Sequence, residues 1–466
     1  MLTHFVVATL LAQQPPQGAR QFVSVTDSVV ALTNVTVIDG TGAAARSGQT
    51  IVLKGGTILS VGDAASAKIP PGARTMDMSG RTVMPGYVML HEHLFYPSGG
   101  GAIYNEQGYS FPRLYLAGGV TTMRTAGNMA GYADLNIRKA IDEGTMLGPA
   151  IDVTAPYLEG PGLPIPQVKA LRDAADARKM VSYWADEGAT SFKAYMHITR
   201  EELGAAAQEA HRRGLKITGH LCSVTFREAA SLGIDDLEHG FVVASDFVPD
   251  KKPDECPAGN AVQRSIAALD VNGAGARDLI ADLVKRRVAI TSTLTIFETF
   301  AASQPSAPAK ALDAMLPEAR RQYEQRRAAI AQSPDTTWNV LVRKEMQLEK
   351  MFADAGGLLV VGTDPMGFGG VIAGYSNQRA LELLVQAGFS PVAAVKIATL
   401  NGARYLGRDA KIGSIAAGKQ ADLIVVRGDP STKIEDVENV ELVFKQGVGY
   451  DSPKIFESVK GRVGLH

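Results

Sequence analysis

The sequence has little cysteine, almost no net charge and no long apolar run, and each shortage excludes a class of protein. Its two cysteines among 466 residues permit one disulfide at most, and they show no Cys-x-x-Cys spacing for zinc. A formal net charge of −1 provides no basic field for nucleic acid or an anionic membrane. No stretch reaches the ~20 apolar residues that span a bilayer. These exclusions leave a globular protein whose partner is a small molecule. They do not exclude a homo-oligomer.

The first twenty residues bear on where the protein works. An apolar run from Phe5 to Ala12 precedes a polar segment that begins at Gln13. This pattern is typical of the hydrophobic part of a secretory signal peptide, although no Lys or Arg precedes the run. We therefore expect residues 1–20 to be a signal peptide or disordered leader, and the protein to be periplasmic or secreted. The alternative is a cytoplasmic protein with a frayed N-terminus.

Both ends of the chain have the composition of β structure. Short runs between residues 28 and 84 alternate β-branched with polar residues and are punctuated by glycine. The same pattern returns in residues 421–430 and 440–448. The sequence therefore predicts one small β-sandwich domain that combines residues 21–84 with residues 409–466.

The middle of the chain, residues 85–408, alternates apolar runs with amphipathic helical segments, which predicts βα units and a parallel sheet. We expect an α/β fold in which eight strands form a (β/α)8 TIM barrel. The stretch between His239 and Asp364 is long for two βα units, and its residues from about 243 to 340 are interpreted as insertions that form a lid. The alternative is that they are solvated surface helices. The eight candidate strands are Gly86–Leu90, Val120–Arg124, Ile151–Ala155, Ser191–Tyr195, Lys216–His220, Asp236–His239, Ala289–Thr293 and Leu358–Thr363.

One helix can be located from its capping pattern. Thr199 and Glu202 have the spacing of a capping box, in which each side chain binds the other residue's backbone N–H. Gly214 follows the last predicted turn, where glycine is favoured as a helix terminator. The sequence therefore predicts a helix that begins after Thr199 and ends before Gly214.

Four of the eight histidines, one lysine and one aspartate stand at or just beyond the ends of these strands. Barrel enzymes place their chemistry at the carboxyl ends of the strands, so these side chains are expected to converge. Imidazole nitrogens and carboxylate oxygens suit borderline divalent metals such as zinc. The candidate metal ligands are His91, His93, Lys193, His220, His239 and Asp364.

Longer motifs around these residues resemble the amidohydrolase superfamily, in its imidazolonepropionase-related and prolidase-like subgroup. The landmarks run in family order from Val83-Met-Pro-Gly to Gly413-Ser-Ile-Ala-Ala-Gly-Lys, and include Gly362-Thr-Asp-Pro. The resemblance implies a binuclear centre that activates water and polarises a carbonyl group. It assigns His91, His93 and Asp364 to one ion, most suitably Zn²⁺, and His220 and His239 to the other.

In this family pattern Lys193 is N-carboxylated by CO2 and bridges the two ions. The physical need is clear, because a free ammonium beside two divalent cations is disfavoured whereas a carbamate supplies an anionic oxygen to each. The resemblance also makes Asp364 the catalytic acid–base, which takes a proton from the attacking water and passes it to the leaving nitrogen.

Three further residues are candidates for substrate binding. Tyr195 shares strand parity with Lys193, His197 lies just beyond that strand, and Arg124 ends the second strand. Each also has an ordinary structural interpretation, as a packed tyrosine, a loop histidine or an internal ion pair.

Hydrolysis of a C–N amide bond in an N-acyl amino acid, dipeptide or cyclic amide is the leading expectation. Hydrolysis of a lactone or an organophosphate would use the same two-metal centre and is an alternative. Ring deamination is a further alternative, but deaminase-like relatives carry a Glu shortly after the histidine that corresponds to His220, and this chain has Leu-Cys-Ser-Val there. A non-catalytic binding protein would be expected to have lost a ligand, and none is missing.

The two cysteines fall near this site. Cys222 follows His220 by two residues, and Cys256 lies in a Pro-rich segment beyond His239. Both are therefore expected on the same face of the barrel, where a disulfide would pin the loop. Export of the protein would favour such a disulfide, because extracellular and periplasmic compartments are oxidising.

Overall fold

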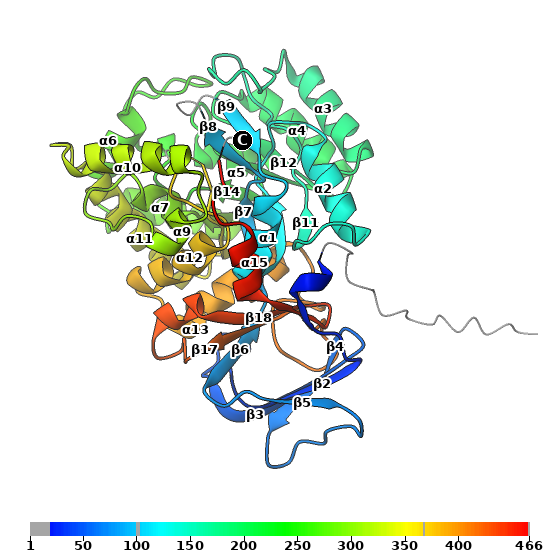
Figure 1. The fold of residues 1–466 in the computed structure, drawn as a ribbon. Helices are drawn as coiled ribbons and strands as arrows, with labels where there is room; N and C mark the ends of the chain where they lie inside the picture. Colours follow the sequence, from blue (N-terminus) through cyan, green and yellow to red (C-terminus); the bar gives the residue numbers. More distant parts are fainter. Residues whose placement is uncertain (1–18, 99–102, 367–368, 465–466) are drawn as a thin grey trace, which may run out of the picture.

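The computed structural model describes residues 19–98, 103–366 and 369–464 and shows a mixed α/β fold (Figure 1). Helices surround a group of parallel strands in the upper part of the view, and a mixed, mostly antiparallel sheet lies below them. The expected leader at residues 1–20 lies outside the described residues as far as position 18. Within the described ranges no helix combines the length and apolar character needed to cross a membrane.

Strands from both ends of the chain form one nine-stranded sheet. In order across the sheet these are β1, β19, β18, β17, β6, β2, β3 and β4, with β5 paired beside β2. Their bounds are Val23–Val25 (β1), Val29–Val37 (β2), Arg46–Lys54 (β3), Thr57–Asp63 (β4), Arg74–Asp77 (β5), Arg81–Pro85 (β6), Leu423–Arg427 (β17), Val440–Lys445 (β18) and Val448–Asp451 (β19).

The strand β17 joins the strands from the two ends of the chain into one sheet, because it lies between β6 and β18. It is antiparallel to both β6 and β18, with Val425 opposite Val83. Leu423 and Val425 pack into the apolar core of the sheet, whereas Ile424 and Val426 join the large core of the helical part. Alternate residues of a strand face opposite sides, so both faces of β17 are buried. Its continuous apolar sequence, Leu-Ile-Val-Val, follows from this position.

Eight further strands form two parallel sheets, and each overlaps one of the predicted ranges. The three-stranded sheet has the order β11, β10, β7, and the five-stranded sheet runs from β12 to β16. The bounds are Tyr87–Glu92 (β7), Val120–Thr125 (β10), Ala150–Asp152 (β11), Ser191–Ala194 (β12), Lys216–Gly219 (β13), Asp236–Glu238 (β14), Ala289–Ser292 (β15) and Leu359–Val361 (β16).

Hydrogen bonds join these two sheets at both of their junctions. On one side, Thr154 forms a parallel bridge with Ser191 just beyond β11. On the other side, the backbone N–H of Thr363 donates to the carbonyl of His91 over 3.0 Å. The second contact brings the end of β16 against β7, so that the first and last parallel strands are neighbours.

The helices that connect the strands cover the outside of the parallel sheets (Figure 1). The capping box predicted at Thr199 is confirmed at the start of α4, which ends at Arg212. The helices are α1 (Ser110–Ala117), α2 (Ala133–Asp142), α3 (Ala174–Asp186), α4 (Arg200–Arg212), α5 (Phe226–Leu232), α6 (Ala261–Ala268), α7 (Ala274–Arg286), α8 (Leu294–Glu298), α9 (Ala309–Leu312), α10 (Pro317–Ala331), α11 (Thr337–Asp354), α12 (Tyr375–Gln386), α13 (Pro391–Lys396), α14 (Gly402–Tyr405) and α15 (Ser452–Ser458). Short helical turns occupy Arg20–Phe22, Ser245–Phe247 and Ile434–Glu438, and a π-helical turn, Ile397–Asn401, joins α13 to α14.

A hairpin that the sequence did not predict follows the first parallel strand. Its strands are β8 (Phe95–Ser98) and β9 (Ile103–Glu106), which pair antiparallel with Phe95 opposite Glu106. The ring of Phe95 stacks on His93 at 4.4 Å, and Tyr104 meets Phe95 edge-on at 5.4 Å. The hairpin therefore places aromatic rings directly beside a candidate metal ligand.

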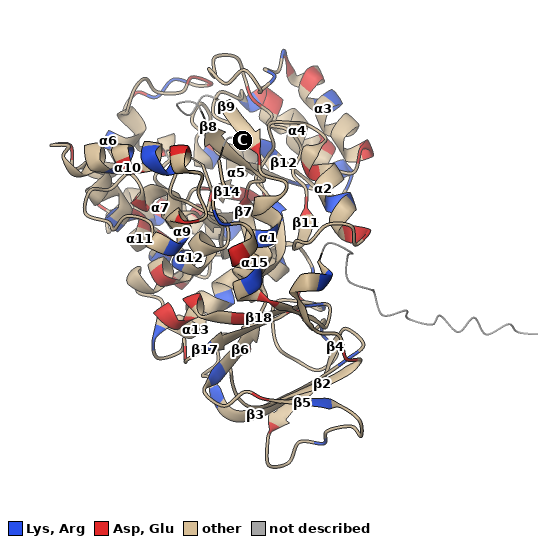
Figure 2. Ribbon diagram, in the orientation of Figure 1, with Lys and Arg blue, Asp and Glu red and all other residues tan. Residues whose placement is uncertain are grey.

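Charged residues are interspersed over the surrounding helices, with Lys and Arg next to Asp and Glu (Figure 2). Ion pairs such as Arg213–Glu209 and Arg200–Asp254 join many of them. A different distribution holds inside the parallel sheets, where Arg124, Lys193 and Glu238 are almost completely buried. Buried charges are costly unless paired, so this interior cluster points to the site.

Candidate metal centre

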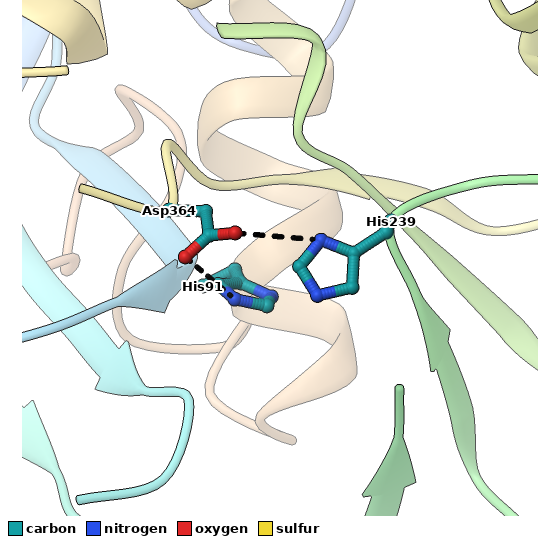
Figure 3. Close-up of side chains that lie close together, drawn as sticks. All are labelled: His91, His239 and Asp364. Carbon is teal, nitrogen blue, oxygen red and sulfur yellow. Dashed lines mark ion pairs between the residues drawn. The ribbon is translucent and has the colours of Figure 1, made fainter. Parts of the chain in front are cut away.

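The structure brings the candidate ligands together at the carboxyl ends of the parallel strands. Asp364 lies at the centre of the group, with its Oδ1 at 3.2 Å from Nε2 of His93 and 3.6 Å from Nε2 of His91. Its other oxygen, Oδ2, lies 3.6 Å from Nδ1 of His239. Figure 3 shows one oxygen of the Asp364 carboxylate directed at His91 and the other at His239. One nitrogen or oxygen from each of these three residues lies within 4.8 Å of the others.

His220 and Lys193 complete the cluster from neighbouring strands. The His220 ring meets the His239 ring at 4.4 Å, and the His91 ring lies 4.5 Å from His239 on the other side. Lys193 is 1% exposed and reaches into the same interior, where its Nζ lies 2.5 Å from Oε2 of Glu238. All six predicted ligands therefore belong to one cluster, in which five are buried and His220 is partly buried.

Two of the ligands adopt a backbone conformation that side chains other than glycine rarely take. His239 has φ of 69° and Asp364 has φ of 53°. His239 directly follows β14, and Asp364 lies three residues beyond the end of β16, so in each case the left-handed turn redirects the side chain after the strand. This explains how the adjacent residues Glu238 and His239 can both face the site. Such conformations persist only where the surroundings enforce them, and they concentrate at functional sites.

Glu92, which lies between His91 and His93, points away from the site, as the alternation of side chains along a strand predicts. Glu92 accepts hydrogen bonds from Thr363 and from Nδ2 of Asn377 on α12. Burial raises the pKa of Glu92 to about 8. Because Thr363 precedes Asp364, this contact fixes the segment that carries the central carboxylate.

The protonation states of the cluster fit a cation site. Burial, followed by the nearby Lys193 ammonium, lowers the pKa of His91 to about 4 and that of His220 to about 3. The rings are therefore neutral near pH 7 and offer lone pairs. Burial alone would raise the pKa of Asp364, but His91 and His93 hold it well below its usual range. The site combines neutral imidazoles with an ionised carboxylate.

Unsatisfied polar atoms provide the test of whether a metal fits. Both ring nitrogens of His91, Nε2 of His93 and Oδ1 of Asp364 are buried without a hydrogen-bond partner. Buried polar atoms in native proteins normally have partners, so a cluster of orphaned ones needs an explanation. Nitrogen and oxygen donors in this combination match a borderline divalent ion such as zinc.

Glu238 belongs to the site, although it was not among the candidates from the sequence. Its side chain is completely buried and contacts Lys193, His91 and Arg124. A pattern that could have revealed it is Asp236-Leu-Glu238, with two carboxylates of the same parity on a buried strand. Burial would raise the pKa of Glu238, but the charges of Lys193, His91 and Arg124 hold it well below its usual value.

The three candidate substrate-binding residues lie in different surroundings. Tyr195 meets His220 edge-on at 5.0 Å and packs against Tyr157 at 4.6 Å. His197 is partly exposed, and its backbone N–H donates to Glu159 over 2.6 Å. Arg124 is 1% exposed, and its guanidinium donates to Oε1 of Glu238 over 2.8 Å. Substrate contact by these three residues stays a prediction.

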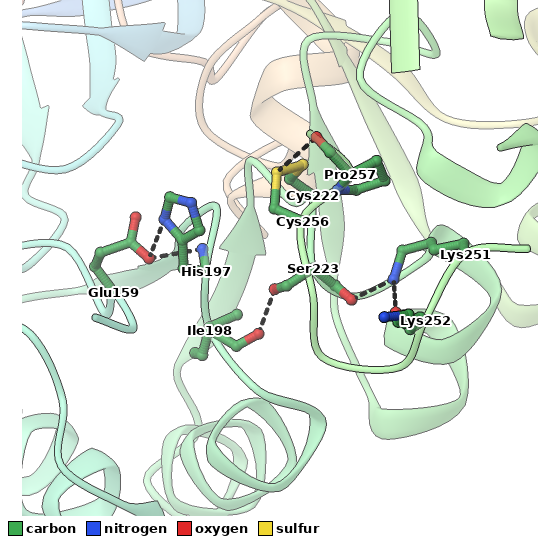
Figure 4. Close-up of a disulfide and its surroundings, with 9 residues drawn as sticks. All are labelled: Glu159, His197, Ile198, Cys222, Ser223, Lys251, Lys252, Cys256 and Pro257. Carbon is green, nitrogen blue, oxygen red and sulfur yellow. Dashed lines mark hydrogen bonds and ion pairs between the residues drawn. A yellow bond between two sulfur atoms is a disulfide. The ribbon is translucent and has the colours of Figure 1, made fainter. Parts of the chain in front are cut away.

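The predicted disulfide is confirmed. Cys222 and Cys256 are joined, with their Cα atoms 4.8 Å apart (Figure 4). The same loop is held by Lys251, whose Nζ donates to the carbonyl of Ser223 over 2.5 Å. The covalent and polar contacts together tie the Pro-rich segment to the residues that follow His220.

The fold and the site together define a class of protein. Parallel strands alternate with helices, and a buried cluster of histidines, a carboxylate and a lysine collects where the strands end. This arrangement is that of an α/β protein with a candidate metal centre at the carboxyl ends of its parallel strands.

Comparison with known proteins identifies the family within that class. Residues 82–449 match the amidohydrolase family, and the chain therefore belongs to it. An imidazolonepropionase from Streptomyces avermitilis is 31% identical over 173 residues, which is 34% of this chain and 39% of that protein. Adenine deaminase 3 of Rhizobium meliloti is 35% identical over 78 residues, 17% of this chain and 13% of that enzyme. The chain thus spans well under half the length of these two curated relatives.

Solved structures agree over nearly the whole chain. A putative prolidase from Bifidobacterium longum has a TM-score of 0.65 at 24% identity and covers 93% of this chain and 99% of its own. A Xaa-Pro dipeptidase with bound methionine in its active site has a TM-score of 0.68 at 20% identity, covering 91% and 100%. At these identities the likeness establishes the fold. The resemblance to imidazolonepropionase-related and prolidase-like members is confirmed.

Proposed function

We propose that this protein is a binuclear metal-dependent hydrolase that cleaves a C–N amide bond in a small molecule. The observation that carries the proposal is the buried cluster of His91, His93, His239 and Asp364, in which ring nitrogens of His91 and His93 and one oxygen of Asp364 have no hydrogen-bond partner. Membership of the amidohydrolase family supports it. A pair of divalent ions, most suitably Zn²⁺, would supply an ionised water and would polarise the scissile carbonyl.

The residues have distinct roles in this proposal. His91, His93 and Asp364 would hold one ion, and His220 and His239 the other. Lys193, carboxylated by CO2 on its Nζ, would bridge them. Asp364 would accept a proton from the attacking water at a carboxylate oxygen and donate it to the leaving nitrogen. The surrounding apolar residues, including Phe95 and Tyr195, would exclude bulk water from this transfer.

The substrate class that we favour is an N-acyl amino acid, a dipeptide or a cyclic amide. The named relatives support this choice, because they include an imidazolonepropionase and structures described as prolidase or Xaa-Pro dipeptidase. Lactone or organophosphate hydrolysis remains an alternative on the same scaffold.

Ring deamination is the second candidate function. The match to an adenine deaminase over 78 residues favours it. The absence of a Glu soon after His220 and the presence of Lys193 count against it. A non-catalytic binding protein is the most remote alternative, because every ligand position of the family pattern is filled.

The architecture that we propose for this enzyme is a closed (β/α)8 barrel of residues 85–408, with insertions from about 243 to 340 as a lid. Hydrogen bonds between the two parallel sheets at Ser191 and at His91 support closure. Phe297 on α8, within the insertion, lies 6.1 Å from the His239 ring and supports a role near the site. Residues 21–84 and 409–466 would form the companion β-sandwich domain.

We also propose that the protein is exported to the periplasm or beyond the cell. The disulfide between Cys222 and Cys256 supports this location, because such bonds persist in oxidising compartments. A cytoplasmic location is the alternative.

A metal-loaded activity screen tests the function. Protein saturated with zinc and bicarbonate is offered N-acyl amino acids, Xaa-Pro dipeptides, cyclic amides, lactones and ring amidines, and elemental analysis counts the bound metal. We expect two zinc ions per chain and release of a new carboxylate together with an amine. Ammonia release without a new carboxylate would reassign the protein to deamination. An active preparation without tightly bound metal would overturn the proposal.

A further inference from the structure

Glu238 is a carboxylate that makes contacts in two directions from the centre of the parallel strands. Its Oε1 accepts hydrogen bonds from Nη2 of Arg124 over 2.8 Å and from Oγ1 of Thr218 over 2.7 Å. Its Oε2 faces the site, 2.5 Å from Nζ of Lys193 and 3.3 Å from Nδ1 of His91. The carboxylate thus has one oxygen held by the protein interior and one turned toward two candidate metal ligands.

Each of these contacts comes from a different strand. His91 lies on β7, Arg124 on β10, Lys193 on β12 and Thr218 on β13, whereas Glu238 itself ends β14. All five side chains are at most 2% exposed. A single carboxylate therefore links five parallel strands below the metal cluster, where a shift of any one strand would be transmitted to the ligands.

We propose that Glu238 is a positioning residue that sets the orientation of both His91 and Lys193 in the metal centre. The role in catalysis rests on the two-metal function proposed above. The contacts themselves are made directly between side chains of this protein. Ligand histidines commonly present one ring nitrogen to the metal and the other to a carboxylate, which fixes the ring.

The two nitrogens of His91 follow that arrangement. Nδ1 faces Glu238 at 3.3 Å, and Nε2 faces Asp364 at 3.6 Å. The approach of Nδ1 to Oε2 is a close contact without hydrogen-bond geometry, and a proton on Nδ1 would leave the lone pair of Nε2 for the side where Asp364 and His93 converge. Rotation of the His91 ring would break both contacts. Glu238 therefore stabilises the ring orientation in which Nε2 faces the proposed metal site.

Lys193 can keep its contact with Glu238 before and after carboxylation. The reaction forms one N–C bond between Nζ and CO2, and the original ammonium releases two protons to solvent. One N–H remains on the carbamate nitrogen, and it is the donor that Oε2 requires. Glu238 therefore holds the stem of Lys193 in one place while its end changes from a cation to an anion.

The substitution Glu238→Gln tests this proposal. A glutamine side chain offers one acceptor oxygen, and the Arg124 and Thr218 donors would take it. Its amide NH2 would then face two other donors, Nζ of Lys193 and Nδ1 of His91. We expect zinc affinity, measured by chelator competition, to fall about 10- to 100-fold. We also expect the carbamate resonance in ¹³C NMR, after labelling with ¹³C-bicarbonate, to be strongly reduced.

Asp236→Asn is the matched control. Asp236 is on the same strand with the same inward parity, is equally buried and lies 3.6 Å from Arg124. It accepts a hydrogen bond from Thr291 and contacts none of the six ligands. This variant should keep wild-type zinc affinity and the carbamate signal. An equal loss in both variants would overturn the proposal, because any buried carboxylate would then serve.

A second variant tests the positioning role of Glu238 if the Glu238→Gln protein does not fold. Thr218→Val removes one hydrogen bond to Oε1 and leaves the carboxylate in place, so a several-fold loss of zinc affinity is expected. Wild-type zinc affinity and carbamate signal in the folded variants would overturn the role of Glu238. A wild-type protein that binds no second zinc and shows no carbamate would instead contradict the proposed two-metal function.

Discussion

Asp364 is the residue on which the site depends most, since its two oxygens lie within 3.6 Å of nitrogens from three histidines. Asp364→Asn keeps the shape of the side chain but removes its charge and its capacity to carry a proton. We expect turnover of the zinc-loaded enzyme to fall about 10²- to 10⁴-fold, the range of acid–base catalysis.

Circular dichroism and elemental analysis check that this variant is folded and metal-loaded before its rate is measured. Full activity in a folded, zinc-loaded Asp364→Asn protein would contradict the assigned role.

A second buried carboxyl gives the protein a pH-dependent stability. Burial raises the pKa of Glu345 on α11 from 4.5 to about 7, against the lowering effect of its hydrogen bond from the backbone N–H of Phe241. A folded-state pKa above the unfolded value means that this contribution is complete below about pH 4.5 and is lost as the pH rises through 7. The loss should amount to about 1–3 kcal/mol.

Glu345→Gln should flatten that part of the stability profile. Urea unfolding at pH 5 and pH 8 measures the effect, as the difference between wild type and variant. Substitution of the exposed Glu201 on α4 by Gln is the control and should leave the profile unchanged. A variant that loses as much stability as the wild type over this range would show that Glu345 is not responsible.

The clustering of the six candidate metal ligands could be predicted from the sequence because each stands at or just beyond the end of an apolar strand. Glu238 could not be predicted in the same way. Its role depends on Arg124 and Lys193 reaching it across the interior from other strands, and on the left-handed backbone of His239, which lets adjacent residues share one site. The local pattern Asp236-Leu-Glu238 indicates a carboxylate on the buried face of the strand but does not show which residues of other strands contact it.

At the level of elements, Gly362 allows the last parallel strand to approach the first. A Cβ at this position would lie 2.4 Å from the backbone nitrogen and from the Cβ of His91. Gly362→Ala should therefore push β16 from β7 and displace His91. We expect a loss of about 1–3 kcal/mol in unfolding free energy, as for other overpacked sites, and weaker zinc binding.

The matched control is Gly62→Ala on β4, where a Cβ would meet no atom within 4 Å. Urea unfolding and chelator competition are the measurements. Equal effects of the two substitutions would show that the close approach at Gly362 does not matter.

The loop beyond β14 depends on its covalent link. The disulfide joins residues 34 positions apart, and closing a loop of this length stabilises a folded chain by about 2–4 kcal/mol. Reduction should lower the melting temperature of the wild type. A Cys222→Ser, Cys256→Ser double variant should melt at that lower temperature with or without reductant. Equal melting of oxidised and reduced wild type would rule out this contribution.

Elements with strong periodic patterns were predictable, and the exceptions have physical reasons. The helix after Thr199 was predicted because a capping box depends only on neighbouring residues. The hairpin of β8 and β9 was not predicted. The segments that carry Phe95 and Tyr104 follow closely on β7 and show no alternation of apolar and polar residues of their own. The π-helical turn at Ile397–Asn401 is similarly invisible to a pattern based on the α-helical repeat.

At the scale of the whole molecule, metal binding and folding should be linked. An ion that binds the folded cluster but not the unfolded chain stabilises the protein by about 2.7 kcal/mol at a 100-fold excess over its Kd. Zinc should therefore raise the melting temperature of chelator-treated protein. Mg²⁺, which prefers an all-oxygen octahedral shell, is the control and should raise it much less. No difference between zinc and chelator would contradict a metal centre in the native fold.

The joining of the two chain ends was predictable only in part. Similar β patterns at both ends suggested a shared domain, and strands from both ends do lie in one sheet. The position of β17 between β6 and β18 was not predictable, because it depends on which of several similar apolar strands pair.

That position has a consequence for biosynthesis. The hydroxyl of Thr82 on β6 donates to the carbonyl of Gly428, a residue 346 positions later. At ordinary ribosomal speeds β6 must wait on the order of tens of seconds for its neighbour to be translated. Meanwhile one edge of an apolar strand is uncovered, and such edges attract other nascent chains. The growing polypeptide should therefore need a chaperone until the strand β17 has emerged.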